Sequence, residues 1–164
     1  MPMKIEGNSN IEAIFSIFHD GVISRHQVKG RELVLEVEIQ YLAERINPTY
    51  RSFQVVLENV ENIRFTTWSS GLKSESELIT EPSIIFKPDL DILEGNIKEE
   101  QIQVICNQAS SDFEYCSGEL YFSATSAIVT DEAGKSYSIE ELDILCKGYW
   151  GEWATKNQQS KMAP

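Results

Sequence analysis

The chain has 164 residues, the length of one ordinary domain, and can bury a hydrophobic core without a disulfide or metal staple. Its 14 Lys and Arg stand against 26 Asp and Glu, so the formal net charge is −12, which repels phosphate backbones and anionic lipid surfaces. Composition therefore argues against direct binding to nucleic acid or to a membrane.

Features tied to cellular compartment indicate a cytoplasmic protein. Residues 1–10 lack the apolar core of a signal peptide, and no run approaches the ~18 apolar residues of a membrane helix. Cys106, Cys116 and Cys146 are odd in number and lack Cys-x-x-Cys spacing, so neither a disulfide framework nor a zinc site is indicated. We expect three free thiols, buried or half-buried.

The first element predicted is a short helix, because apolar residues recur at helical spacing at Ile11, Ile14, Phe15 and Phe18. A turn follows at His19-Asp20-Gly21. Adjacent His and Asp can transfer a proton or ligate a metal, but on an extended chain they point to opposite faces. We therefore expect a structural motif, in which Asp20 stabilises the turn at Gly21 through backbone hydrogen bonds.

Three strands are predicted next. From Arg31 to Leu42 apolar and polar residues alternate, so the core face of a half-buried strand should carry Leu33, Leu35, Val37 and Ile39, and the outer face Glu36 and Glu38. The alternation recurs at 53–57 and 63–65, with turn-prone residues between them, which predicts a hairpin of consecutive strands.

The middle of the chain is irregular and acidic. Residues 84–86 are apolar but lie between Pro82 and Pro88, which predicts an edge or irregular strand. Asp89, Asp91 and Glu94 resemble the start of a calcium loop, yet Leu93 occupies the third ligand position, so a solvated acidic loop is expected. A firmer strand follows at 102–106.

The last part should hold a second hairpin. Residues 119–130 are rich in β-branched and aromatic types, and a short loop at 131–134 leads to Tyr137 and Ile139. Ser138 and Glu141 predict a capping box over a short helix.

These elements predict an all-β fold, an antiparallel β-sandwich or flattened barrel with one or two short helices. Residues 1–154 should form a single β domain, and the polar residues 155–164 a flexible tail.

The apolar segment ending in Phe18-His19-Asp20-Gly21-Val22-Ile23, the alternating strand after it and residues 53–59 together resemble small uncharacterised bacterial β-sandwich proteins. Some proteins of this kind look like immunity proteins encoded beside toxins. The resemblance extends over the first 70 residues and assigns a role to no single residue.

No signature of catalysis is present: the chain lacks a Gly-x-Ser-x-Gly elbow, a catalytic Cys motif and a Gly-rich phosphate loop, and its two histidines lack metal-ligand spacing. We expect no catalytic residue, metal ligand or cofactor. The first hypothesis is a noncatalytic interaction protein, such as an immunity-like inhibitor, whose acidic surface meets a basic protein partner. Its candidate interaction residues are Glu36, Glu38, Glu75, Glu77, Glu81, Asp89, Asp91, Glu94, Trp150 and Trp153.

Two alternatives stay open. A small-ligand-binding β domain would place a pocket near Trp68, Trp150 or Trp153, although the two C-terminal tryptophans also suit the closed end of a core. An enzyme would use His19 and Asp20, but this dyad names no reaction by itself.

Overall fold

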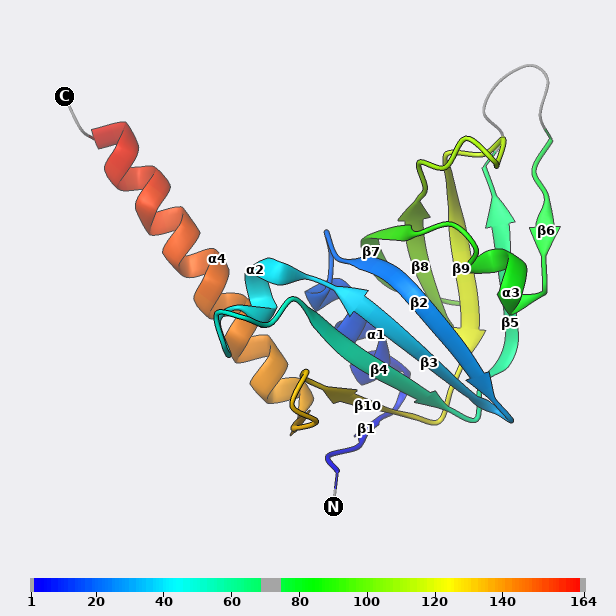
Figure 1. Cartoon of the computed structure of the whole chain (residues 1–164), viewed down its shortest axis with the longest axis horizontal. Helices are drawn as coiled ribbons and strands as arrows, with labels where there is room; N and C mark the ends of the chain where they lie inside the picture. Colours follow the sequence, from blue (N-terminus) through cyan, green and yellow to red (C-terminus); the bar gives the residue numbers. More distant parts are fainter. Residues whose placement is uncertain (1, 69–74, 163–164) are drawn as a thin grey trace.

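The computed structural model describes residues 2–68 and 75–162. Its strands form one antiparallel sheet in the order β1-β10-β4-β3-β2-β7-β8-β9-β5-β6, with β11 paired to β10 (Figure 1). One half of the sheet comprises β1 (Ile5–Glu6), β2 (Val22–Lys29), β3 (Glu32–Glu38), β4 (Ser52–Glu58), β10 (Ser126–Thr130) and β11 (Ser136–Tyr137). The other comprises β5 (Glu61–Thr67), β6 (Leu78–Ile79), β7 (Leu90–Lys98), β8 (Gln101–Asn107) and β9 (Ser117–Ser123). The helices are α1 (Asn8–Ile17), α2 (Gln40–Ala43), α3 (Pro82–Ile85) and α4 (Ile139–Met162).

The predicted all-β antiparallel class is confirmed. The halves meet through only two register pairs of β2 and β7, Val22 with Asp91 and Ile23 with Leu90. The predicted register of β3 is also confirmed, because Leu35 and Val37 have no exposed surface while Glu38 between Val37 and Ile39 is exposed.

Helix α1 forms as predicted and fills the space against β7 and β8. Ile11, Ile14 and Phe15 are fully buried, and the Phe15 ring lies 5.7 Å from that of Phe122 on β9. A Cβ atom at Gly95 on β7 would lie 3.0 Å from the Glu12 carbonyl oxygen and 3.1 Å from the Phe15 Cβ. Glycine at this position therefore lets the helix approach the sheet closely.

The predicted hairpin of residues 53–57 with 63–65 is wrong. Both segments are strands, but β4 pairs with β3 and β10, whereas β5 pairs with β9 and β6. Between them Asn59 takes a positive φ of 52° and the Val60 N–H donates to the Arg31 carbonyl, so the chain crosses from one half of the sheet to the other. The chain crosses back between β9 and β10, where the Thr125 N–H donates to the Glu58 carbonyl.

Two further expectations for the middle of the chain are wrong. Residues 82–85 form α3, because proline suits the first turn of a helix. The Phe86 N–H donates a hydrogen bond to the Pro82 carbonyl at 2.9 Å. The expected acidic loop is part of β7. A bulge between Ile92 and Glu94 breaks the alternation of apolar and polar residues there, which hid the strand.

The second hairpin is confirmed only in its last part. The predicted run 119–130 divides into β9 and β10, which pair with strands in different halves of the sheet. The loop at 131–134 joins β10 to β11, with Val129 opposite Tyr137. The capping box is confirmed: the Ser138 N–H donates to Glu141 Oε1 at 3.0 Å, and the Glu141 N–H donates to Ser138 Oγ at 3.1 Å.

Helix α4 is much longer than the short helix expected and starts at Ile139, which was assigned to a strand. It continues past Thr155, the start of the expected polar tail, to Met162. No proline interrupts the sequence between the cap and Pro164, so nothing ends the helix early. Its first turns pack on α1, and Arg45 after α2 pairs with Glu152 at 2.9 Å.

The buried Asp131 in the β10–β11 loop predicts a loss of stability in acid. Burial alone raises the pKa of this carboxyl, but hydrogen bonds from the Tyr137 hydroxyl and the Lys135 and Ala133 N–H groups outweigh burial and hold it below its usual value. A carboxyl whose pKa is lower in the folded state than in the unfolded state stabilises the fold at pH values above its ordinary, unfolded pKa. This stabilisation is lost as the pH falls through the pKa of the folded state. We expect the free energy of unfolding of the wild type to fall more steeply below about pH 4 than that of Asp131→Asn.

Urea unfolding at several pH values between 2 and 7 would measure this difference, with Glu38→Gln, at an exposed carboxylate on β3, as the control. If the free energy of unfolding changes with pH in the same way for the wild type and Asp131→Asn, then Asp131 does not cause the loss of stability in acid.

Candidate functional site

The His19-Asp20-Gly21 motif lies between α1 and β2. The His19 ring contacts the Ser16 carbonyl through Nδ1 at 2.8 Å, and its Nε2 lies 3.9 Å from the Asp20 carboxylate, which is 65% exposed. Asp20 takes a positive φ of 70°, and its backbone N–H donates to the Ile92 carbonyl at 2.8 Å. Asp20 thus holds the turn through its own backbone, while its carboxylate faces His19.

Gly21 is required by packing rather than by its backbone conformation, because the positive φ of the turn is at Asp20. A Cβ atom there would lie 2.9 Å from the Phe18 carbonyl oxygen and 3.0 Å from Val37 Cγ1. The motif therefore joins α1 to the core strands.

Trp150 and Trp153 belong to an aromatic cluster near the middle of α4 and share no site with the acidic candidates. The Trp150 ring stacks on His19 with centroids 5.3 Å apart, and it contacts Tyr41 and Tyr149 edge-on. Its Nε1–H is buried without a hydrogen-bond partner among the described residues, and Trp153 is half exposed. The cluster fastens α4 to the turn at His19.

A cavity lies between β6, α3 and the loop of residues 112–115. β6 and α3 stand at the far end of the molecule from α4 (Figure 1). The volume of the cavity is about 510 Å³, and we call it the acidic pocket. Three of the predicted interaction residues, Glu75, Glu77 and Glu81, line it. The sequence placed them in an irregular segment, and the structure places them around β6.

Two more carboxylates, Asp112 and Glu114, come from the loop before β9. No Lys, Arg or His lines the pocket among the residues that the structure describes. The ion pairs of residues 2–68 and 75–162 include none of Glu75, Glu77, Glu81 or Asp112. The pocket therefore concentrates negative charge in a concave space, where low-dielectric walls strengthen the field.

Aromatic and aliphatic side chains form the remaining walls. Trp68 is 43% exposed, and the Phe113 and Tyr115 rings pack edge-on with centroids 5.8 Å apart. Tyr115 is 8% exposed, and its hydroxyl has no hydrogen-bond partner in the described chain. Burial, with Cys106 nearby, raises the pKa of Tyr115 to about 12, so the hydroxyl stays protonated.

The contribution of residues 112–115 was missed by sequence analysis. Acidic and aromatic residues alternate in Asp112-Phe113-Glu114-Tyr115, and this pattern was the available signal. It did not stand out because Asp112 and Trp68 are far apart in sequence and meet only in the folded chain.

The other acidic candidates lie elsewhere. Glu36 on β3 faces the Arg25 guanidinium at 3.8 Å, while Glu38 and Glu94 are exposed on β3 and β7. Burial, and then the charge of Asp89, raises the pKa of Asp91 on β7. The structure thus separates the predicted acidic surface into the pocket group and scattered strand residues.

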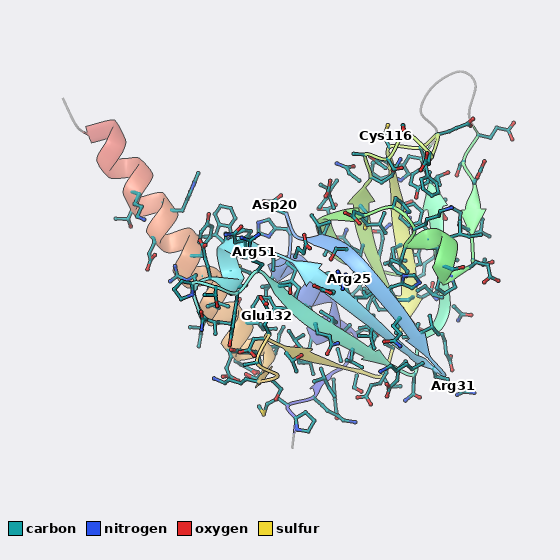
Figure 2. All side chains as sticks on the ribbon, viewed as in Figure 1. Asp20, Arg25, Arg31, Arg51, Cys116 and Glu132 are labelled. Atoms are coloured by element: carbon teal, nitrogen blue, oxygen red, sulfur yellow. The ribbon has the colours of Figure 1, made fainter. Side chains whose placement is uncertain are left out.

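The three cysteines are free, as expected, but not all of them are buried or half-buried. Cys106 is buried and Cys146 half-buried, whereas Cys116 is exposed in the loop before β9 (Figure 2). Within the described ranges, no group of three or more His, Cys, Asp or Glu residues could hold a metal ion.

Comparison with protein-family models, with curated proteins and with solved structures finds no match to the chain. None of the helices in residues 2–68 and 75–162 has the length and apolar character needed to cross a membrane.

Proposed function

We propose that the chain is a noncatalytic interaction protein that binds a basic protein partner through the acidic pocket, as an immunity-like inhibitor would. The observation that carries the proposal is the composition of the pocket: Glu75, Glu77, Glu81 and Asp112, which enter no ion pair of the described residues, and three aromatic rings, with no cationic side chain among the described lining residues. Carboxylates and aromatic faces both attract Lys and Arg side chains.

The charge of the pocket suits a partner that is attracted electrostatically. Arg25, Arg31 and Arg51 belong to the β2–β4 half of the sheet (Figure 2), while Arg64 on β5 belongs to the same half as the acidic pocket but does not line it. Concentrated negative charge steers a basic partner toward the pocket, and salt screens this attraction.

A second candidate function is binding of a small cationic ligand. The pocket volume of about 510 Å³ falls within the range of ligand pockets, and Trp68 offers an exposed ring for stacking. This alternative differs from the first in that the occupant would be a free molecule.

Two charge-reversal variants test the proposed function. Glu77→Lys with Glu81→Lys changes the pocket, and Glu38→Lys with Glu94→Lys applies the same change of net charge to exposed residues elsewhere. Proteins retained from the native host at low salt would be identified, purified and titrated against each variant by calorimetry.

We expect a basic partner whose affinity falls at least about tenfold in the pocket variant, stays within about twofold in the control, and weakens as salt rises. Equal binding by the two variants, or no retained protein with the wild type, would overturn the proposal. In the second case a fluorescence screen of small cations against Trp68 would test the alternative.

A further inference from the structure

The sheet ends at β6, and the backbone direction of this strand can be read from its pairing. The Thr67 N–H donates to the Glu77 carbonyl at 2.9 Å, and Thr66 stands opposite Leu78. Backbone hydrogen bonds alternate in direction along an antiparallel strand. Glu77 therefore directs its backbone groups to β5, whereas Leu78 directs its own to the other side of β6, which we call the open side because no strand of the described residues pairs with it.

The open side of β6 borders the acidic pocket. β6 is the last strand in the order of the sheet, and in Figure 1 it stands at the margin of the molecule. Leu78 is 63% exposed, and Leu78, Ile79 and Thr80 all line the pocket. Unpaired backbone groups at a sheet edge are a template for another strand.

The size of the pocket suits an occupant longer than one residue. A single Lys or Arg side chain fills only part of about 510 Å³. In an extended segment, alternate side chains point to the same face, so a strand beside β6 would present every second residue to the pocket. The carboxylates at Glu75, Glu77 and Glu81 are distributed along β6 and its flanks and would meet such side chains in succession.

We propose that an extended basic segment of the partner protein adds a strand to the open edge of β6 and places alternate Lys or Arg side chains in the acidic pocket. This inference rests on the proposed function and specifies how the partner is recognised. Main-chain hydrogen bonds to Leu78 supply affinity, and the carboxylates select basic side chains.

Two substitutions at Leu78 distinguish the contribution of its backbone N–H to binding from the contribution of its side chain. Leu78→Pro removes the N–H that points to the open edge and leaves the bonds from Glu77 to β5 in place, since proline is tolerated at an edge with this orientation. Leu78→Thr also removes the leucine side chain but keeps the N–H. The probe is a synthetic peptide, acetyl-Thr-Arg-Val-Arg-Thr-Arg-Thr-amide, titrated into ¹⁵N-labelled full-length protein and followed by NMR.

We expect the wild type to bind the peptide and to show slowed hydrogen exchange at the Leu78 amide. Affinity should fall about tenfold in Leu78→Pro and change by no more than about threefold in Leu78→Thr. Equal affinities for the two Leu78 variants, or no binding by the wild type at millimolar peptide, would overturn strand addition. If the Leu78 variants bind equally while Glu77→Lys with Glu81→Lys abolishes binding, strand addition fails and the acidic pocket stands. If this charge reversal leaves peptide binding unchanged, the proposed function fails as well.

Discussion

Substituting Gly118→Ala is expected to destabilise the folded protein by about 3 kcal/mol, because the site has no room for a methyl group. A Cβ atom on Gly118 would lie 2.3 Å from Phe65 Cε1, 2.5 Å from its Cζ and 2.7 Å from the Thr66 carbonyl oxygen. Phe65 is fully buried, and its ring packs 5.4 Å from that of Tyr115. The ring cannot move aside without disturbing the wall of the acidic pocket.

Urea unfolding would measure this change as a lower midpoint. Gly151→Ala on α4 is the matched control, because nothing lies within 4 Å of a Cβ atom there and alanine favours a helix, so we expect a gain of up to about 1 kcal/mol. A loss below about 0.5 kcal/mol for Gly118→Ala would show that the β5–β9 contact is looser than described.

The second large effect is expected at Phe15, where truncation to alanine should cost about 4 kcal/mol. The side chain is fully buried between α1 and the sheet, with its ring 5.7 Å from Phe122 and its Cβ close to Gly95. The backbone contact between helix and strand prevents collapse onto the space vacated, so a cavity remains.

Ile144→Ala is the matched control, because Ile144 lies on a helix but is 70% exposed and should change stability by less than about 0.5 kcal/mol. Chemical denaturation should show a lower midpoint for Phe15→Ala with an unchanged dependence on denaturant. A loss below about 1 kcal/mol would mean that α1 repacks on the sheet.

The fold was predictable from sequence where a local pattern is complete. In β3 each core residue alternates with an outward one from Leu33 to Glu38, and in α1 the apolar spacing of Ile11, Ile14 and Phe15 is helical. Both patterns reflect burial on one face, which the sequence records directly. The position of α1 and the orientation of β3 were therefore recovered, but the strand expected to reach Leu42 ends at Glu38 and residues 40–43 form α2.

Strand pairing was not predictable in the same way. Turn-prone residues at Asn59 and Asn62 indicate that the chain changes direction, but not whether the next strand pairs with the last. In this fold β5 finds its partner in β9, which follows much later in the sequence. The bulge at Glu94 hid a strand for a different reason, since one extra residue reverses the inward and outward order.

The candidate site was half predictable. Glu75, Glu77 and Glu81 were selected for their charge, and they line the acidic pocket. Asp112 and Phe113 were not selected, because their role depends on the loop before β9 folding over β5. The sequence contains the charge of the site but not the concave shape that concentrates it.

The crossing of the chain from β4 to β5 has a consequence for synthesis on the ribosome. One edge of β4 pairs with β3 and the other with β10. The first residue of β10, Ser126, donates a hydrogen bond to Glu58 at the end of β4 and follows Glu58 by 68 residues. The hairpin of β2 and β3 and its contact with β4 can form as soon as these segments emerge, but the apolar edge at Val55 and Leu57 then waits for β10. At 5–20 residues per second, roughly, that wait lasts several seconds, during which the nascent chain presents an unpaired strand to its neighbours. Pausing of translation between Glu58 and Ser126 would lengthen this interval and increase aggregation of the nascent chain.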